Sequence, residues 1–163
     1  VALQNSASAK IYGFAANAKI NLTDELIASG SFTYTAGKYD AVGTKDNGFA
    51  VVPMDHIPPV FGRLGLQYIQ PKYNIEVYSI FNGRKALSDY NPLPASEDNL
   101  QYAIAGYGTP SWITLNVKSS YTINSKWTLQ GGVENIFDRN YRYFASGFSA
   151  PGRSFIIALR SNF

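Results

Sequence analysis

Apolar and polar side chains alternate, one residue at a time, along the C-terminal segment of the chain. Its apolar residues are Phe155, Ile157, Leu159 and Phe163, with residues such as Arg160 between them. An alternation with a period of two residues puts one kind of side chain on each face of a β-strand. Six more segments alternate in the same way and none has a helical period, so we predict seven strands, over residues 9–22, 26–36, 59–70, 73–82, 113–123, 127–137 and 154–163.

The connections between these strands are short and long in turn. Tight turns occupy residues 22–25, 70–72 and 124–126, and long segments rich in Gly, Pro, Asp and Asn occupy residues 37–58, 83–110 and 138–152. All the long segments fall at the same end of the strands. Unstructured loops beyond about 12–15 residues are uncommon in compact domains, but bacterial outer-membrane barrels combine short periplasmic turns with long extracellular loops. The connections therefore favour an all-β fold, an antiparallel transmembrane β-barrel.

The two faces of the predicted strands differ from those of a soluble barrel. The polar face carries mainly Ser, Thr, Asn and Gln, and the apolar face has small or aliphatic residues in mid-strand and aromatic residues at the strand ends. Aromatic rings favour the two interfaces of a bilayer, so this layering is typical of a lipid-facing surface. The predicted membrane girdle includes Tyr68, Tyr73, Tyr121, Trp127, Phe155 and Phe163. The alternative is that these rings, which are good strand formers, fill the core of a soluble β-sandwich.

The composition excludes several classes of protein and site. Among 163 residues there is no cysteine and one histidine, His56, so neither a disulfide framework nor a Cys-based or two-His metal site is expected. Charged residues make up 15% of the chain, against roughly 25% in soluble domains. The net charge of +3 without a stripe of Lys and Arg argues against nucleic acid as a partner. No nucleophile and base can be assembled around the single histidine, so we expect no enzyme, no cofactor and no metal site.

Seven strands do not make a complete membrane barrel. Each unpaired backbone group on a sheet edge in lipid costs several kcal/mol, so a sheet in a membrane must close. Single-chain bacterial barrels have even strand numbers, and this chain begins on the side of the long loops. We therefore expect the C-terminal part of a larger barrel, cut in a surface loop, with its first and last strands paired to strands supplied elsewhere.

Three stretches of the sequence resemble a known family. Residues 133–142 contain VENIFDRNYR, an Asn-apolar-Phe-Asp core followed by Tyr; residues 151–155 contain PGRSF and begin a last strand that ends on Phe163; residues 10–39 contain IYGF, LTD and FTYT. Together they resemble the penultimate strand, the last strand and an earlier hairpin of the TonB-dependent outer-membrane receptors. Residues 53–59 and 146–153 look most like members that take up iron chelates or haem.

The resemblance implies a barrel of about 22 strands, plugged by an N-terminal globular domain, that imports a scarce nutrient with energy from the TonB complex. Residues 1–163 would form part of the barrel wall. The N-terminal barrel strands, the plug and the TonB-interacting segment are expected on a missing part of the protein or on a partner chain. The implied location is the bacterial outer membrane, with the long loops extracellular, the C-terminus periplasmic, and the lipid bilayer and lipopolysaccharide as neighbours.

Aromatic and cationic residues gather in the second and third long loops. They are Arg84, Lys85, Tyr90, Tyr102, Tyr107, Tyr141 and Arg142, with Tyr143 beside the last two. Rings and cations suit an anionic, partly aromatic chelate through stacking and charge-assisted hydrogen bonds. We therefore predict that these residues capture a nutrient ligand such as a siderophore or haem. The alternative is that they pack the loops against one another or meet lipopolysaccharide phosphates.

Two other functions stay open from the sequence. One missed strand would allow a small, complete outer-membrane barrel of about eight strands with a structural or adhesion role. A soluble, lipocalin-like binding barrel is the third possibility. Closure of the sheet within the chain would support the small barrel, and an open first strand would support the fragment.

Overall fold

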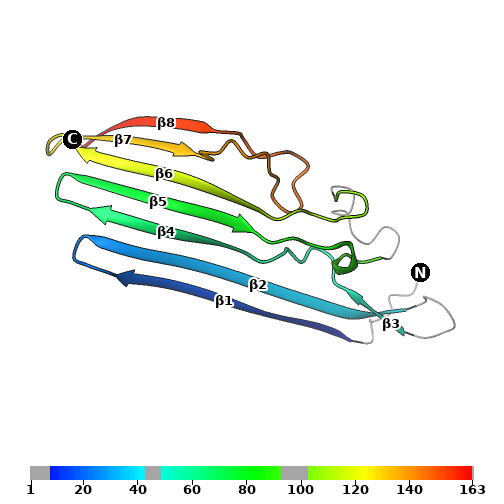
Figure 1. Ribbon diagram of the computed structural model, residues 1–163. Coiled ribbons are helices and arrows are strands. Elements are labelled where there is room, and N and C mark those ends of the chain that lie inside the picture. The colour runs from blue at the N-terminus through cyan, green and yellow to red at the C-terminus, as the bar shows by residue number, and fades with distance from the viewer. Residues whose placement is uncertain (1–7, 43–48, 93–102, 163) are drawn as a thin grey trace.

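Eight strands form one antiparallel sheet in the computed structural model, which describes residues 8–42, 49–92 and 103–162 (Figure 1). The strands are β1 (Ala9–Asn21), β2 (Leu26–Val42), β3 (Phe49–Pro53), β4 (Phe61–Ile69), β5 (Tyr73–Asn82), β6 (Trp112–Thr122), β7 (Trp127–Glu134) and β8 (Ser154–Ser161). All except β3 lie side by side in chain order, and β3 pairs with the far end of β2. This arrangement confirms the predicted fold class.

Short turns join the strands at one end of the sheet, and the long connections lie at the other end (Figure 1). Side chains close two of the short turns by taking the place of backbone acceptors. The Thr23 hydroxyl accepts hydrogen bonds from two backbone N–H groups, at 3.2 and 3.0 Å. The side-chain carbonyl of Asn124 does the same between β6 and β7, at 2.9 and 3.0 Å. The turn chemistry is therefore local to each hairpin.

The predicted strands are confirmed, with three corrections at the loop end. β2 continues to Val42 rather than residue 36, and β3 pairs with this extension inside a segment that was expected to be an unstructured loop. The strand predicted over residues 127–137 ends at Glu134, because Asn135 adopts a left-handed φ of 50°. One turn of 3-10 helix, η1 (Leu87–Asp89), is the single helical segment of the described residues, where none was predicted.

One face of the sheet is apolar across its width. The register places Ala28, Leu66, Val77, Val117, Val133 and Phe155 in one row from β2 to β8. Large side chains on this face are exposed, including Leu64 at 59% and Ile157 at 81%. Within the described residues the buried hydrophobic side chains are Val52, Tyr90 and Trp112, all at the loop end. A soluble sandwich would bury the row, so the sheet instead presents a surface that lipid can cover.

The opposite face is polar and carries the mid-strand charges. Glu76 on β5 lies directly opposite Gln67 on β4 and Lys118 on β6. Arg63 lies on the same face of β4, four residues before Gln67. The alternation along each strand therefore sorts the residues into two chemically distinct faces, as the sequence predicts.

The sheet is open at both edges in the part of the chain that the structure describes (Figure 1). β1 pairs with β2 and β8 pairs with β7, and β1 and β8 lie at opposite ends of the strand order. A small complete barrel would need these two strands to pair, so the open first strand favours part of a larger barrel. No helix in the described ranges has the length and apolar character needed to cross a membrane.

Candidate functional site

Lys85 is the point at which the three long connections meet. The residue is 3% exposed, and its Nζ donates a hydrogen bond to the carbonyl oxygen of Ile57 at 2.7 Å. The same Nζ lies 4.4 Å from the ring centre of Tyr90 and 4.5 Å from that of Phe144. Ile57 precedes β4, Tyr90 follows β5 and Phe144 follows β7. One buried ammonium group therefore joins three loops through a hydrogen bond and two cation–π contacts.

The second loop is also held together by its own hydrogen bonds and is fastened to β2. The hydroxyl groups of Tyr90 and Thr109 form a hydrogen bond, and Asn91 Nδ2 donates to the Tyr39 hydroxyl at 2.7 Å. Lys85 and Thr109 exchange two backbone hydrogen bonds, at 3.0 and 2.9 Å. Tyr90 is 2% exposed and Asn91 is 1% exposed. These contacts make Lys85 and Tyr90 part of the framework that shapes the loops.

Arg84 and Tyr107 form an exposed pair on the second loop. The guanidinium carbon of Arg84 lies 3.9 Å from the ring centre of Tyr107, and Arg84 Nη2 donates to the Tyr107 carbonyl oxygen at 3.0 Å. Gly106 and Gly108, on either side of the tyrosine, both have positive φ angles, which glycine adopts without strain. The loop therefore presents an oriented cation on an aromatic ring to solvent.

Three aromatic rings cluster beside the third loop and line a hollow. The ring centre of Trp112, the first residue of β6, lies 4.2 Å from that of Tyr141 and 5.0 Å from that of Tyr143. The indole N–H of Trp112 donates to the Arg142 carbonyl oxygen at 2.9 Å. The hollow has a volume of about 490 Å³, and Arg139 and Arg142 also line it. Aromatic rings and two arginines thus share one concave surface.

The phenol of Tyr141 is neutral at physiological pH. Burial raises its pKa from 10.0 to about 12, and a hydrogen bond with Tyr143 contributes to the rise. Tyr141 lies in the connection between β7 and β8, beyond the strands. The neutral phenol places no negative charge at the hollow, whereas a phenolate would repel an anion there.

Asn135 forms the base of the third loop. It is 2% exposed and has a left-handed backbone, which asparagine adopts more readily than most residues. Its side chain accepts a hydrogen bond from the Arg139 N–H at 2.9 Å and donates one to the Arg139 carbonyl oxygen at 2.8 Å. Its own N–H donates to the side-chain oxygen of Asn116 at 2.8 Å. These bonds turn the chain out of β7 and hold it against β6.

Asp138 and Arg153 close the same loop where the chain returns to β8. Asp138 Oδ1 accepts a hydrogen bond from the Arg153 N–H at 2.7 Å, and Arg153 Nε donates to the Ile136 carbonyl oxygen at 2.8 Å. Asp138 is also left-handed, with φ 52°. The VENIFD and PGRSF stretches that carry the family resemblance therefore meet in space. Their shared residues build the closure of one loop.

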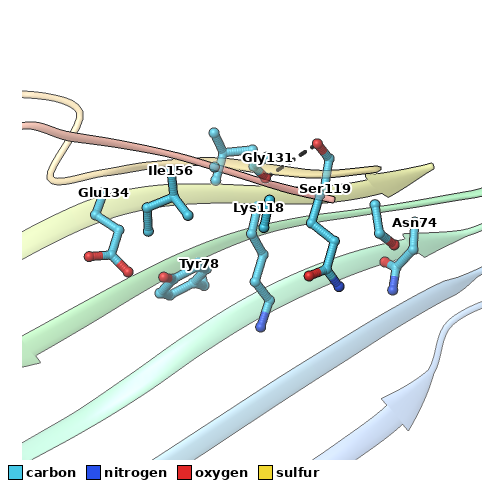
Figure 2. Close-up of a pocket in the computed structure, with 12 residues that line it drawn as sticks. Asn74, Tyr78, Lys118, Ser119, Gly131, Glu134 and Ile156 are labelled. Carbon is cyan, nitrogen blue, oxygen red and sulfur yellow. Dashed lines mark hydrogen bonds between the residues drawn. The ribbon is translucent and has the colours of Figure 1, made fainter. Parts of the chain in front are cut away.

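A charged network crosses the polar face on β4, β5 and β6. Glu76 is 8% exposed and forms ion pairs with Arg63 and with Lys118, whose Nζ lies 2.8 Å from Glu76 Oε2. The Arg63 guanidinium lies 4.3 Å from the ring centre of Tyr78. The adjoining hollow has a volume of about 370 Å³. In Figure 2, Glu134 and Tyr78 lie on one side of the Lys118 side chain. This face of the sheet can therefore make both ionic and hydrogen-bonded contacts.

The structure separates the predicted ligand residues into three groups. Tyr141 and Arg142 lie at the hollow, Arg84 and Tyr107 form the exposed pair, and Lys85 and Tyr90 are buried in the loop framework. Tyr102 lies outside the described residues. Sequence reasoning missed Trp112, Arg139 and Phe144. The signal available for Trp112 was an aromatic residue at the loop end of a strand, but its partners lie about 30 residues further along the chain.

The predicted girdle residues share the apolar face. Tyr68, Tyr73, Tyr121 and Trp127 lie near the short turns, Phe155 lies toward the loops, and Phe163 is outside the described residues. The rings of Tyr68 and Tyr73 are 6.0 Å apart between centres. Neighbouring strands thus contribute adjacent rings to one edge of the apolar band.

His56 adopts a left-handed φ of 60° in the turn after β3 and is exposed. Across the described ranges, no group of His, Cys, Asp and Glu is arranged to hold a metal ion. The aromatic and cationic hollow is therefore the best candidate for ligand contact at the loop end.

The sequence itself identifies the family. Residues 1–136 match the family described as TonB dependent receptor-like, beta-barrel. The chain belongs to the TonB-dependent receptor family. None of the curated proteins matches the sequence significantly. Barrels of TonB-dependent receptors lie in the bacterial outer membrane, which agrees with the exposed apolar face.

Solved TonB-dependent receptors share the fold. The copper transporter OprC gives a TM-score of 0.75 at 19% identity, over 95% of this chain and 23% of that protein. The siderophore receptor PiuA from Acinetobacter baumannii gives 0.63 at 17% identity, over 94% and 22%. The ferric-catecholate import receptor Fiu from E. coli K12 gives 0.63 at 16% identity, over 95% and 21%. The chain spans less than a quarter of each receptor, so its sheet is part of a barrel.

Proposed function

We propose that this chain helps to capture an anionic metal chelate outside the cell and to import it across the outer membrane, in a process driven by the TonB complex. The observation that carries the proposal is the hollow of about 490 Å³ at the loop end. It is lined by the rings of Trp112, Tyr141 and Tyr143 and by Arg139 and Arg142. Iron chelates, siderophores or haem, are the proposed cargo.

The chemistry of the hollow suits such a ligand. Siderophores and haem carry negative charge and flat or aromatic groups, which guanidinium groups and aromatic rings recognise through charge-assisted hydrogen bonds and stacking. The neutral Tyr141 phenol adds no negative charge at the same surface. The Arg84–Tyr107 pair extends the proposed capture surface across the second loop.

The loop framework supports capture in a second way. Loops that are already packed together lose less conformational entropy when a ligand binds. Lys85 joins three connections, and Tyr90 packs on Phe144 with ring centres 6.4 Å apart. We assign these two predicted residues to holding the surface in shape, rather than to direct ligand contact.

The similar structures favour metal cargo. PiuA is named as a siderophore receptor, Fiu as a ferric-catecholate import receptor and OprC as a copper transporter. The rest of the barrel, the plug and the segment that meets the TonB complex would come from the remaining length of the receptor. In this arrangement the long loops are extracellular, the C-terminus is periplasmic and the aromatic girdle lies at the membrane interfaces.

The test uses the complete receptor in cells that lack other routes for iron uptake. Uptake of a ferric catecholate, a ferric hydroxamate and haem is measured with and without a working TonB complex, at matched surface abundance. We expect Arg139→Gln with Arg142→Gln to lower uptake of the preferred anionic chelate at least about tenfold, since two charge-assisted contacts are removed. Lys126→Gln, a neutralising change in a short turn, is the control and should leave uptake unchanged.

Two results would refute the proposal. Uptake of none of these chelates by the unaltered receptor would exclude iron-chelate import. Uptake that persists at the same rate without TonB would exclude the energy source. Uptake by the double variant equal to that of the unaltered receptor would show instead that Arg139 and Arg142 do not contact the ligand.

A further inference from the structure

Phe148 is the most exposed large apolar side chain of the described residues, at 84%. It lies in the connection between β7 and β8, six residues before the first residue of β8. Ile157 and Phe155, which are also highly exposed, lie within β8 on the apolar face that lipid can cover. Lipid does not account for Phe148 in the same way, because this residue lies outside the sheet. Its ring is therefore an apolar surface at the loop end.

Hydrogen bonds fix the turn that carries Phe148. The Ser146 hydroxyl donates to the Phe148 carbonyl oxygen at 2.9 Å and accepts from the Phe148 N–H at 3.2 Å. The Ser146 N–H donates to the Tyr143 carbonyl oxygen at 3.2 Å, and Ala145 adopts a left-handed φ of 65°. A left-handed backbone is unfavourable for alanine, so the turn holds its shape against local strain. The ring is presented from a fixed backbone, and a ligand that contacts it has little chain to order.

This turn stands at the edge of the hollow that the proposed function uses. Ala145 and Ser149 line the hollow, and Phe148 lies between them in the sequence. Two further lining residues, Ile104 and Tyr143, are also exposed. The hollow therefore combines exposed apolar groups at its edge with the two arginines that line it.

The rings inside the hollow are already packed against one another. The ring centre of Trp112 lies 4.2 Å from that of Tyr141 and 5.0 Å from that of Tyr143, and the two tyrosine ring centres are 5.6 Å apart. The three pairs of ring planes are inclined by 41°, 89° and 71°. A flat group that stacks between two rings needs their planes parallel and about 7 Å apart, since carbon atoms pack at about 3.5 Å. These three rings therefore form a wall and leave no slot between them.

The ring of Phe148 differs from these three because it is free. In the described part of the chain, no ring contact and no cation–π contact joins it to another side chain. A free ring gains from stacking on another aromatic group, and it gains less from an aliphatic group of the same charge. Phe148 can therefore distinguish between anionic chelates that Arg139 and Arg142 attract by charge alone.

We propose that Phe148 determines the specificity of the hollow, and that it favours metal chelates with flat aromatic groups over aliphatic anionic chelates. The Phe148 ring stacks on an aromatic group of the chelate at the edge of the hollow, while Arg139 and Arg142 contact its charged groups. This inference rests on the proposed function, since it requires that the hollow takes up a chelate. It adds the chemical class of that chelate and the residue that selects it.

The experiment measures binding to the complete receptor, purified in mild detergent, of three chelates. A ferric catecholate and haem carry flat aromatic groups, and ferric citrate is anionic and aliphatic. We expect Phe148→Ala to weaken binding of the preferred aromatic chelate about fivefold and binding of ferric citrate less than about twofold, since one stacking contact is lost. Phe148→Tyr should keep the affinity, and Phe148→Leu should fall between the two. Leu87→Ala, at an exposed apolar residue of η1 that does not line the hollow, is the control and should leave binding unchanged.

A second measurement tests whether Phe148 is accessible in the complete receptor. The 163 residues contain no cysteine, so a cysteine placed in this chain can be labelled on whole cells with a membrane-impermeant maleimide, with the unaltered receptor as the background. We expect labelling of Phe148→Cys and of the control Ser88→Cys, an exposed residue of η1 that does not line the hollow. A saturating concentration of the preferred chelate should protect the Phe148→Cys variant and leave labelling of the Ser88→Cys variant unchanged.

The outcomes separate this inference from the proposed function. Binding of neither the three chelates nor a ferric hydroxamate by the unaltered receptor would refute the proposed function. Binding of ferric citrate or the hydroxamate as tightly as the aromatic chelates would leave that function standing and overturn the inference. A Phe148→Ala variant that binds the aromatic chelate as tightly as the unaltered receptor, or that loses the same factor for ferric citrate, would also overturn it. So would a Phe148→Cys variant that is not labelled, because the rest of the receptor would then cover the residue.

Discussion

Replacing Asn135 should loosen the third loop and leave the barrel intact. In the Ala variant, the Arg139 backbone loses an acceptor at 2.9 Å and a donor at 2.8 Å. Each hydrogen bond contributes about 1 kcal/mol net, so the pair is worth about 2 kcal/mol. Alanine must also adopt the left-handed φ of 50°, which costs about 1 kcal/mol. The sum of about 3 kcal/mol raises the open fraction of the loop roughly 100-fold.

Glycine separates the two contributions. Asn135→Gly removes the same side-chain hydrogen bonds but adopts a positive φ without strain, so it should cost about 2 kcal/mol, or about 1 kcal/mol less than alanine. The complete receptor in detergent would be digested with a protease of broad specificity, and cleavage within residues 138–152 timed by mass spectrometry. Hydrogen exchange at Ile136, whose N–H donates to the Leu115 carbonyl oxygen at 2.9 Å, gives an independent measure of opening.

The third loop should open most often in the Ala variant, less often in the Gly variant and least often in the unaltered protein. The unfolding temperature of the barrel should stay the same. Cleavage and exchange rates that do not differ among the three proteins would show that Asn135 does not hold the loop. Equal cleavage and exchange rates for the Ala and Gly variants would show that the left-handed backbone at residue 135 contributes no strain in the Ala variant. A fall in barrel stability as large as the loop effect would mean that Asn135 belongs to the sheet rather than to the loop closure.

The remaining predictions test the faces, the network and the hollow. Ile157→Arg places a charge on the lipid-facing side, two residues from Phe155 and about 10 Å along the membrane normal from the level of Trp127. It should lower the free energy of unfolding, measured with denaturant in vesicles, by about 2–3 kcal/mol. Ala158→Arg, on the polar face of the same strand, should cost far less, and similar losses would reverse the face assignment. Glu76→Gln should lower the free energy of unfolding by about 1–2 kcal/mol, because Arg63 and Lys118 then face each other without a counter-charge. Lys118→Gln in the same protein should recover part of this loss, and additive losses would show that the two residues are not coupled. Because the pKa of Tyr141 lies near 12, above its usual 10.0, the neutral phenol contributes fully to loop packing below pH 10 and this contribution is lost as the pH rises through 12. The absorbance difference between the unaltered receptor and Tyr141→Phe should titrate near pH 12, and a midpoint near 10 would contradict the burial.

The loop framework was beyond prediction because its contacts join distant parts of the chain. Asn91 and Tyr39 are 52 residues apart, and Lys85 and Ile57 are 28 apart. From the sequence, Lys85 and Tyr90 differ in no way from the exposed Arg84 and Tyr107. Burial decides between framework and ligand contact, and burial depends on which loops meet.

The boundaries at the loop end failed for a related reason. The extension of β2 to Val42 contains Gly37 and Asp40, which weaken a strand signal. It forms because β1 pairs with residues 37–39 and β3 pairs with residues 38–42. The early end of β7 follows from the hydrogen bonds of Asn135, which the alternation of side chains does not register. Pairing and capping partners therefore override local preference at these ends.

The stretches VENIFDRNYR and PGRSF carried the resemblance to the TonB-dependent receptors. The alternation of side chains by itself determined most of the strands and the two faces of the sheet. It could do so because a β-strand turns each successive side chain to the opposite face, so the pattern is set residue by residue along the backbone. Only the tertiary structure decided which loop residues are buried, how Trp112 meets Tyr141, and that Lys10 and Lys38 stand opposite each other. These relations depend on register and on the meeting of loops, and both arise only when separate segments of the chain come together.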